Sequence, residues 1–261
     1  MFNVLSKQVV LAVMGIAALS SCVTAGEMIN EPRVFTGANG STLPYRLVIP
    51  AGYDASKVYP LVLCLHGAGG RGIDNQGKGC QAFTTLSSAE VQAEYPAVLL
   101  MPQCPTGAQW VDTPWSDGSY SLDKIAISQP MRLVLEILDS AQKEFSIDPA
   151  RIYISGQSMG GYGSWDFILR EPNRFAAAAI VCGAGDPSKA ERIAGLPIWV
   201  FHGDADPTVP VSGSRDMVAA LKAVGGNVKY TEYPGVEHKS WGRAWKEKDL
   251  VPWLFSQKKV D

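Results

Sequence analysis

Short apolar runs recur along this chain, and they restrict the folds that are open to it. Residues 60–65, 97–101, 151–155, 176–182 and 197–202 each form such a run. An unbroken run of this kind is typical of a strand buried on both faces of a sheet, whereas a strand with one wet face alternates. With 261 residues, 46% of them hydrophobic, the chain is long enough to bury one large core.

Segments with helical spacing separate these runs. The clearest one follows Ser128, a residue type that caps helices, and its apolar positions are Met131, Val134, Leu135, Leu138, Ala141 and Phe145. We expect further helices at 212–224 and 247–256, another strand at 227–233, and an N-terminal hairpin over 34–49. Strands that alternate with amphipathic helices predict an α/β fold, with a mostly parallel central sheet and helices on both faces.

The run at 151–154 leads directly into the pattern Gly156-x-Ser158-x-Gly160. A serine on a sharp turn from strand to helix projects its hydroxyl outward, and only glycine fits the crowded positions on either side. A glycine-rich structural turn is the alternative. Because each glycine in the following helix costs about 1 kcal/mol relative to alanine, their retention favours close backbone packing under a functional site. We interpret Ser158 as a nucleophile.

A serine hydroxyl needs a base, usually histidine, and the chain has three histidines. His66 and His202 each end an apolar run and precede glycine, so we expect them to brace loops. His238 lies in a loop after the last predicted strand and is the preferred base, with a surface histidine as the alternative interpretation.

The carboxylate that orients the base should follow a strand between Ser158 and His238. Asp204 and Asp206 both follow the run at 197–202. We prefer Asp206, which precedes a proline in the turn, and keep Asp204 as the second choice. Asp186, after an earlier strand, is a minor alternative.

An oxyanion intermediate requires two backbone N–H donors. The amide of Met159 follows the nucleophile directly. The second should come from the glycine-rich loop after the run at 60–65, where we choose Ala68, with Gly67 and Gly69 as alternatives. That loop lacks the Lys-Ser/Thr pair of a phosphate-binding loop and the spacing of a dinucleotide site.

Residues 103–128 form a long segment with little periodicity, after a strand, where loops of this length are usually functional. Trp110 and Trp115 in this segment, and Trp241 near His238, are candidates for lining a pocket for an aromatic or sugar-bearing ester. Plain packing of large side chains is the competing interpretation for each.

Metal, cofactor and nucleic-acid functions have little support. The chain contains no H-E-x-x-H motif, paired C-x-x-C motif or carboxylate cluster, and we predict no metal and no cofactor. Its net charge is −2 and its basic residues are dispersed, which argues against nucleic-acid binding.

The first 22 residues have the pattern of an export signal. Lys7 precedes an apolar stretch at 9–19 that is too short to span a bilayer, and Leu19-Ser20-Ser21-Cys22 follows. This last pattern resembles a bacterial lipobox, which implies a lipidated Cys22. We interpret residues 23–31 as a tether and residues 32–261 as the α/β domain that carries the site. An ordinary secretory signal is the alternative, and either places the mature protein outside the cytoplasm.

Four further cysteines follow Cys22. Cys64 and Cys182 lie within apolar runs, so we expect buried thiols. Cys80 and Cys104 lie in predicted loops, and a disulfide between them is an open hypothesis for a protein outside the cytoplasm.

Four motifs together carry a resemblance to a known family. They are LHGAGGRGIDN at 65–75, MPQCP at 101–105, GQSMGGYG at 156–163 and IWVFHGDADPTVP at 198–210. In this order they resemble the phospholipase/carboxylesterase-like branch of the α/β-hydrolase superfamily, close to feruloyl esterases, acetyl xylan esterases and polyhydroxybutyrate-depolymerase-like esterases. The resemblance covers about residues 30–256.

This resemblance implies an α/β-hydrolase fold without a large cap domain. It implies Ser158, Asp206 and His238 as catalytic residues, Met159 and Ala68 as oxyanion donors, and Trp110 near the substrate. The favoured hypothesis is a lipid-anchored serine carboxylesterase acting on short-acyl or hydroxycinnamoyl esters, which polysaccharide can carry. A serine peptidase or amidase, an acetyl xylan esterase and a non-catalytic binding lipoprotein are the alternatives.

Overall fold

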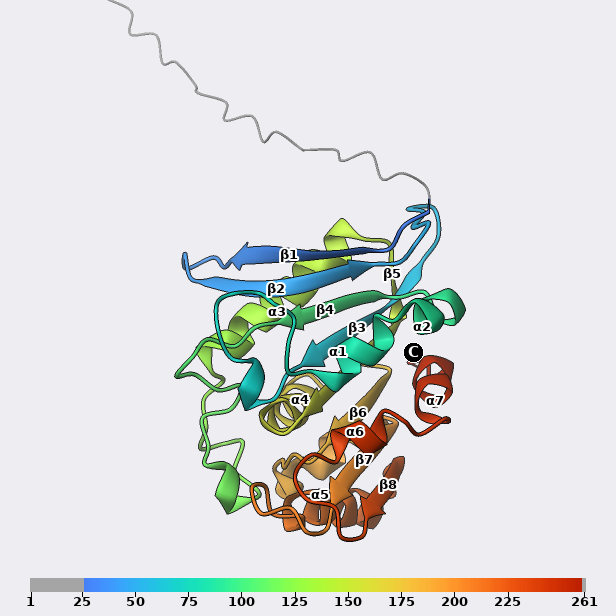
Figure 1. The fold of residues 1–261 in the computed structure, drawn as a ribbon. Helices are drawn as coiled ribbons and strands as arrows, with labels where there is room; N and C mark the ends of the chain where they lie inside the picture. Colours follow the sequence, from blue (N-terminus) through green and yellow to red (C-terminus); the bar gives the residue numbers. More distant parts are fainter. Residues whose placement is uncertain (1–25, 260–261) are drawn as a thin grey trace, which may run out of the picture.

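The structure is a computed structural model that describes residues 26–259. One eight-stranded sheet runs through it, with the strand order β1-β2-β4-β3-β5-β6-β7-β8 (Figure 1). The predicted signal, its lipobox Cys22 and the first residues of the predicted tether lie outside the described residues. Among residues 26–259, no helix is both long and apolar enough to cross a membrane.

Five of the eight strands, β3 to β7, correspond to the apolar runs of the sequence. They are β1 (Ile29–Thr36), β2 (Thr42–Ile49), β3 (Tyr59–Leu65), β4 (Val98–Pro102), β5 (Ile147–Gln157), β6 (Ala177–Val181), β7 (Ile198–Gly203) and β8 (Val228–Tyr233). Strand β2 is antiparallel to both of its neighbours, and all other pairs are parallel. The prediction of a mostly parallel sheet is therefore confirmed.

The N-terminal hairpin is longer than the sequence indicated. Strand β1 begins at Ile29, which pairs with Ile49 of β2, so residues 29–31 belong to the sheet and not to a tether. The ladder continues without a break to Thr36, opposite Thr42. Backbone pairing with β2 makes β1 begin at Ile29, five residues before the start predicted from the side-chain pattern.

Alternate residues of a strand point to opposite faces of the sheet, so a fully apolar strand presents hydrophobic side chains on both. Helices cover both faces. In β3, Leu61, Leu63 and Leu65 join one buried cluster, whereas Val62 and Cys64 join the other. The first face carries α3 (Gln129–Glu144), α4 (Met159–Arg170), α5 (Ser212–Ala223) and the 3-10 helix η3 (Pro187–Ile193). The second carries α1 (Gln81–Leu86), α2 (Ala89–Glu94), α6 (Trp241–Ala244) and α7 (Leu250–Ser256).

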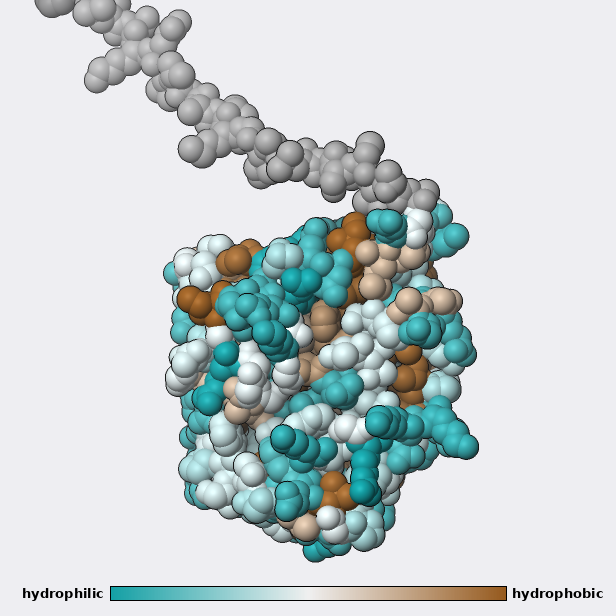
Figure 2. Space-filling view, in the orientation of Figure 1, coloured by the Kyte–Doolittle hydropathy of each residue, from teal (hydrophilic) through white to brown (hydrophobic). Residues whose placement is uncertain are grey.

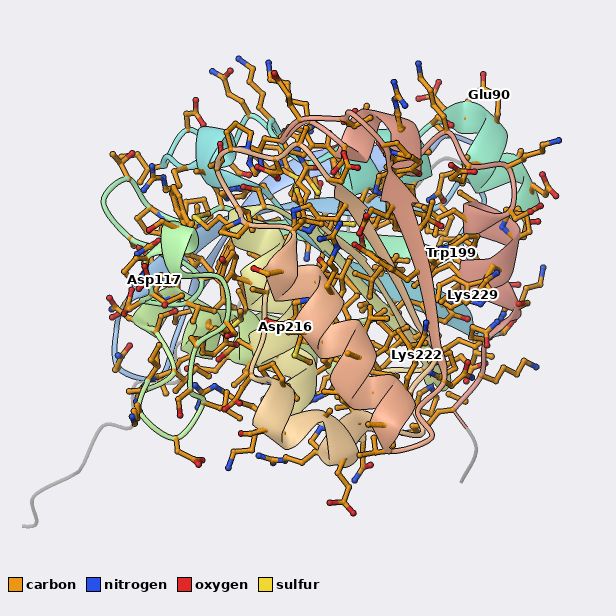
Figure 3. All side chains as sticks on the ribbon, turned by 90° about the horizontal axis from the view of Figure 1, so that it is seen from below. Glu90, Asp117, Trp199, Asp216, Lys222 and Lys229 are labelled. Atoms are coloured by element: carbon orange, nitrogen blue, oxygen red, sulfur yellow. The ribbon has the colours of Figure 1, made fainter. Side chains whose placement is uncertain are left out.

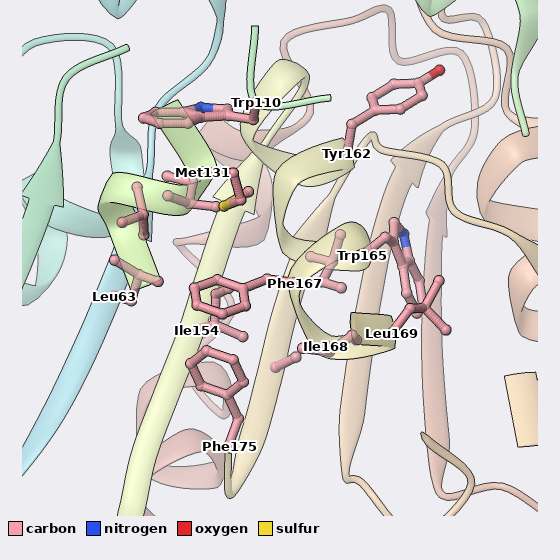
Figure 4. Close-up of a cluster of buried hydrophobic side chains, with 14 of the residues drawn as sticks. Leu63, Trp110, Met131, Ile154, Tyr162, Trp165, Phe167, Ile168, Leu169 and Phe175 are labelled. Atoms are coloured by element: carbon pink, nitrogen blue, oxygen red, sulfur yellow. The ribbon is translucent and has the colours of Figure 1, made fainter. Parts of the chain in front are cut away.

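A cluster of buried side chains on the first face joins α4 to the central strands (Figure 4). Leu63 of β3 and Ile154 of β5 face Phe167 of α4, and Phe167 meets Phe175 edge to face with ring centroids 5.1 Å apart (Figure 4). Trp165 of the same helix is fully buried. This packing fixes α4, and with it the turn that leads into the helix, against the sheet.

The start of α3 confirms the predicted cap. Ser128 Oγ accepts the Met131 N–H at 3.3 Å, and Pro130 stands in the first turn, where its missing N–H costs nothing. Ser128 Oγ also donates to the Trp110 carbonyl at 2.8 Å, which ties the irregular segment before the helix to its first turn.

The face shown in Figure 2 is mostly hydrophilic, with small separate apolar patches. The large hydrophobic side chains exposed among the described residues are Val34, Val58, Ile73 and Val224. On the edge strand β8, the ammonium of Lys229 lies 3.7 Å from the ring centroid of Trp199 and shields that ring (Figure 3). A lysine on an exposed edge also opposes pairing with another chain.

Candidate active site

The strand-to-helix turn between β5 and α4 holds Ser158 in a conformation that few residues adopt. Its backbone has φ 55° and ψ −122°. A side chain on Gly156 would place Cβ 2.1 Å from the Gly160 carbonyl oxygen, and one on Gly160 would place it 2.0 Å from the Leu65 carbonyl oxygen. Both glycines are therefore sterically required. The Ser158 N–H donates to the Val181 carbonyl at 3.0 Å, which holds the turn against β6.

Three side chains from distant parts of the sequence meet beyond the carboxyl ends of the strands. Ser158 Oγ lies 2.8 Å from His238 Nε2, and His238 Nδ1 lies 2.7 Å from Asp206 Oδ2. A carboxylate can only accept a hydrogen bond, so His238 Nδ1 must carry the proton that it donates to Asp206. His238 Nε2 then has a free lone pair and accepts a hydrogen bond from the serine hydroxyl. This is the geometry in which an imidazole can take a proton from a serine.

The Asp206 carboxylate is fully buried and has four N–H donors. Oδ1 accepts the amides of Thr208 at 2.8 Å and Val209 at 2.9 Å, while Oδ2 accepts His238 and also His202 Nε2, at 3.2 Å. Burial alone would raise the pKa of Asp206, but the hydrogen bonds from His202, His238 and the two amides hold it well below its ordinary value. The group is a permanent anion beside the imidazole.

The two other carboxylates that the sequence left open lie elsewhere. Asp204 Oδ1 accepts the Gly235 N–H at 2.6 Å, in an exposed turn. Asp186 accepts the Leu122 N–H at 2.7 Å and caps η3 through Ser188. Of the three, Asp206 is the carboxylate that contacts His238.

Two backbone amides are available for an oxyanion. Met159 is the first residue of α4 and Ala68 is the first residue of the 3-10 helix η1 (Ala68–Gly70), so neither amide has an acceptor within its own helix. The alternative donor Gly67 is already committed, because its N–H donates to the Gly79 carbonyl at 3.1 Å. Arg71 Nε donates to the Ala68 carbonyl at 3.1 Å and steadies this turn.

His66 braces the same loop from behind. Its Nε2 accepts the Cys104 N–H at 2.9 Å, so Nδ1 carries the proton and donates to the Gly67 carbonyl at 2.6 Å. Burial lowers the pKa of His66 to about 4, and the ring stays neutral at pH 7. Trp110 Nε1 donates to the His66 carbonyl at 3.0 Å. The expectation that His66 braces a loop agrees with these contacts.

A cavity of about 450 Å³ opens onto Ser158 and His238. The loop at 67–69, Gln157, Trp115 and Trp241 line this cavity together with the serine and the histidine. The Trp241 ring meets the His238 ring edge to face at 5.3 Å, and the Arg71 guanidinium lies 5.7 Å from the Trp115 ring centroid. The remaining wall residues are Gly79, Cys80, Gln81, Thr84 and Thr208.

The three tryptophans predicted to line a pocket separate into two groups. Trp115 and Trp241 do line it. Trp110 does not: its side chain is fully buried, packed against the His66 ring at 5.2 Å, behind the loop and outside the cavity. An indole N–H that finds a buried backbone carbonyl explains this placement.

The hypothesis of a Cys80–Cys104 disulfide is wrong for this structure. All four cysteines among the described residues, Cys64, Cys80, Cys104 and Cys182, are free and buried. Cys80 belongs to the cluster on one face of the sheet, with Cys64 as its neighbour, and Cys104 belongs to the cluster on the other face.

One group of side chains among the described residues could offer three ligand atoms to a cation. It comprises Cys182, Asp206 and His238, whose candidate atoms lie within 4.8 Å of one another. Asp206 and His238 already use these atoms in hydrogen bonds, and burial raises the pKa of Cys182 to about 12, which keeps its thiol protonated. Their chemistry fits a proton relay better than a metal site.

The fold and the site define the class of the protein. A mostly parallel sheet with a serine at a strand-to-helix turn that borders a cavity, and a histidine and an aspartate beside it, is the arrangement of α/β-hydrolases. The chain belongs to the phospholipase/carboxylesterase family, whose family model matches residues 51–247. It is accordingly a hydrolase of carboxylic esters.

Individual relatives agree with this assignment. The chain is 26% identical over 219 residues to "Probable feruloyl esterase C" of Aspergillus terreus, which covers 82% of this chain and 74% of the relative. It is 38% identical to a structure described as a thermostable esterase, with a TM-score of 0.80, over 88% of this chain and 63% of the other. The feruloyl esterase module from Clostridium thermocellum shares the fold at 18% identity, with a TM-score of 0.65, over 91% of this chain and 90% of the module.

Proposed function

We propose that this protein is a serine carboxylesterase in which Ser158, His238 and Asp206 act as a catalytic triad. The observation that carries the proposal is the unbroken hydrogen-bonded line from Ser158 Oγ through the imidazole to the buried carboxylate, at 2.8 Å and 2.7 Å. Ser158 and His238 line the same cavity as Ala68. A nucleophile, a base and an oxyanion donor therefore border the same space.

The first half of the reaction forms an acyl-enzyme. Ser158 Oγ attacks the ester carbonyl carbon while His238 Nε2 takes the hydroxyl proton. The carbonyl oxygen becomes an oxyanion that accepts hydrogen bonds from the N–H groups of Met159 and Ala68. Asp206 stabilises the imidazolium through its hydrogen bond with Nδ1. When the intermediate collapses, the bond to the alkoxy oxygen breaks and His238 hands its proton to the leaving alcohol.

The second half reverses the roles with water as the nucleophile. Water enters beside His238, whose side chain is 20% exposed to solvent. The imidazole removes one proton from the water as its oxygen attacks the acyl carbon. Collapse of this second tetrahedral intermediate breaks the bond to Ser158 Oγ, which regains the proton, and the carboxylic acid leaves.

For the substrate, we propose short-acyl or hydroxycinnamoyl esters. The tryptophans at 115 and 241 give the cavity flat apolar walls, against which an aromatic acyl group can stack. The relative named as a feruloyl esterase supports the hydroxycinnamoyl class. The cavity of about 450 Å³ is not enclosed, so an alcohol carried on a polysaccharide can extend outward.

For the location, we propose export and a lipid anchor on Cys22. The export signal and lipobox pattern at 1–22 support this, and a tether between Cys22 and β1 would leave the domain free of the membrane surface. Palmitate labelling that disappears in Cys22→Ala would support the anchor. Unchanged labelling of that variant would contradict it.

A substrate panel tests the proposed activity. Turnover of p-nitrophenyl acetate, methyl ferulate and a peptide anilide should show ester hydrolysis well above anilide hydrolysis, and Ser158→Ala should reduce it to background. Faster turnover of the anilide would favour a peptidase or amidase. Full activity in Ser158→Ala would overturn the assignment of the nucleophile.

A further inference from the structure

The buried carboxylate of Asp206 is shared by two histidines, and the second one takes no part in the proposed mechanism. His202 is the penultimate residue of β7, and its ring is fully buried. Its Nε2 lies 3.2 Å from Asp206 Oδ2 and 3.1 Å from the Val209 carbonyl oxygen. A carboxylate and a carbonyl are both acceptors only, so Nε2 must carry a proton that points between them.

The other nitrogen of His202 is tied to the first turn of α5. Nδ1 lies 2.8 Å from Ser214 Oγ, which itself lies 3.1 Å from the Gly183 carbonyl oxygen. The Ser214 side chain is also fully buried. Both ring nitrogens are therefore engaged, so the imidazole can neither turn nor leave its site without breaking buried hydrogen bonds.

Gly183 connects this chain of contacts to the nucleophile. A Cβ on Gly183 would lie 2.5 Å from the Gly161 carbonyl carbon, so the loop after β6 and the first turn of α4 are in backbone contact. Contacts therefore lead from Asp206 through His202 and Ser214 to Gly183. Gly183 packs against α4, the helix that begins directly after Ser158. With His238 included, these contacts join loops that follow β6, β7 and β8.

We propose that His202 is a positioning residue of the catalytic triad, which fixes the Asp206 carboxylate and moderates its pull on the His238 proton. This proposal rests on the proposed function of that triad. The carboxylate has about four acceptor sites and receives four N–H donors. Removal of His202 leaves Oδ2 with one donor in a place where Asp206 has no access to solvent.

The electrostatic consequence has a definite sign. An N–H donor stabilises negative charge on Oδ2 and so weakens the attraction that this oxygen exerts on a protonated His238. Without His202, the imidazolium gains stability and His238 becomes more basic. The other charged group facing His202 is Glu232, its register partner on β8, and Arg215 of α5 already neutralises it through bonds of 2.7 Å and 2.9 Å.

Two substitutions of His202 distinguish a role as hydrogen-bond donor from a role in packing alone. His202→Leu removes the donor, whereas His202→Gln can return an N–H to the position of Nε2. We expect His202→Leu to lower kcat on p-nitrophenyl acetate about 10- to 100-fold, since a carboxylate displaced by 1 Å loses this much. KM should stay within about twofold, because His202 does not line the cavity. His202→Gln should recover most of the lost activity.

A matched control measures how much kcat falls when a buried hydrogen bond that does not involve Asp206 is lost. Ser155 of β5 donates from Oγ to the Ala179 carbonyl of β6 at 2.7 Å and has no hydrogen bond to Asp206, so Ser155→Ala should keep kcat near the wild-type value. Ser214→Ala keeps His202 but frees its ring, so its effect should have the same direction as that of His202→Leu and be smaller. It also serves if His202→Leu does not fold.

A measurement that does not depend on turnover completes the test. The chain has three histidines, so their ring resonances can be assigned by single substitutions and followed by NMR against pH. In His202→Leu, or in Ser214→Ala, His238 should titrate at a higher pH than in the wild type, and His202→Gln should restore the wild-type midpoint. If the wild type hydrolyses no ester, the proposed function fails, but this titration still decides the role of His202.

Three results would overturn the proposal. One is a folded His202→Leu variant with wild-type kcat. Another is an unchanged or lowered titration midpoint of His238. The third is a loss of activity that follows the loss of thermal stability equally in His202→Leu, His202→Gln and Ser155→Ala.

Discussion

Replacing Gly160 with alanine should change the free energy of unfolding in two opposite ways, through helix propensity and through steric strain. The size of the measured change therefore shows which effect is larger. Gly160 is the second residue of α4, where alanine would stabilise a free helix by about 1 kcal/mol. In the folded protein, the added methyl group would lie 2.0 Å from the Leu65 carbonyl oxygen and 2.8 Å from the His66 carbonyl oxygen. Ordinary contact begins at 3.4 Å, and these neighbours are backbone atoms at the end of β3, which cannot move aside alone.

Steric strain should therefore exceed the gain in helix propensity. Overpacking of a rigid site costs about 1–3 kcal/mol, and a shift of the whole strand end costs more. We expect Gly160→Ala to lower the free energy of unfolding by about 2 kcal/mol. Because residues 65–66 lead into the turn at Ala68, the same shift of about 1 Å should reduce kcat about 100-fold.

Urea unfolding and p-nitrophenyl acetate kinetics measure the two effects on the same sample. Gly195→Ala is the matched control, since a Cβ there meets nothing within 4 Å, and it should change stability by less than about 0.5 kcal/mol. A Gly160→Ala variant as stable and as active as the wild type would refute the steric account of the turn.

Four further predictions follow from the site. Asp206→Asn should lower kcat by about 10³- to 10⁴-fold, whereas Asp204→Asn, which alters an exposed contact with Gly235, should change it only a few-fold; the reverse ranking would show that the acid is wrongly assigned. The folded-state pKa of His66 is about 4, below its ordinary 6.5, so the stability that neutral His66 contributes is present above pH 6.5 and is lost as pH falls toward 4. Urea unfolding at pH 7, 6 and 5 should show this decline, and His66→Gln should flatten it; equal slopes in both proteins would contradict the assignment. Trp115→Ala and Trp241→Ala should raise KM for methyl ferulate more than for p-nitrophenyl acetate, while Trp110→Phe should lower thermal stability with little change in that ratio, and a uniform effect of all three would argue against the cavity walls. Thiol titration of the domain in denaturant without reductant should find four free thiols among residues 26–259, and a count of two would revive a disulfide.

Much of the fold could be predicted because β3, β4, β6 and β7 are buried along their whole length. Four of the five apolar runs have nearly the bounds of a strand, as residues 60–65 do for β3, whereas β5 extends beyond the run at 151–155 at both ends. The turn at Ser158 could be predicted as well, since only glycine satisfies the steric limits at 156 and 160.

The short helices were not predictable from periodicity. Helices α1 and α2 have six residues each, less than two turns, and residues 81–94 show no repeated apolar spacing that could mark them. These helices are held by contacts with the sheet. Cys80 caps α1 on the face of the sheet opposite Cys104, so the separation of these two cysteines is also without a local sequence signal.

The wall of the cavity depends on side-chain directions in irregular segments. Trp110 and Trp115 lie five residues apart in one aperiodic segment, yet one is buried behind the loop and the other lines the cavity. The donor role of Trp110 toward His66 is a tertiary contact without a local sequence signal. In the same way, the sequence marked His202 as a loop brace but gave no sign that it shares the carboxylate of Asp206.

The central claim is that Ser158 is activated by His238 and attacks the ester. Fluorophosphonate labelling followed by peptide mass spectrometry, with esterase activity measured on the same samples, tests it directly. We predict one adduct per chain, on Ser158, loss of activity in proportion to labelling, and much slower labelling of His238→Ala. Ester hydrolysis that persists when Ser158 is fully modified, or an adduct on a different serine, would contradict the claim.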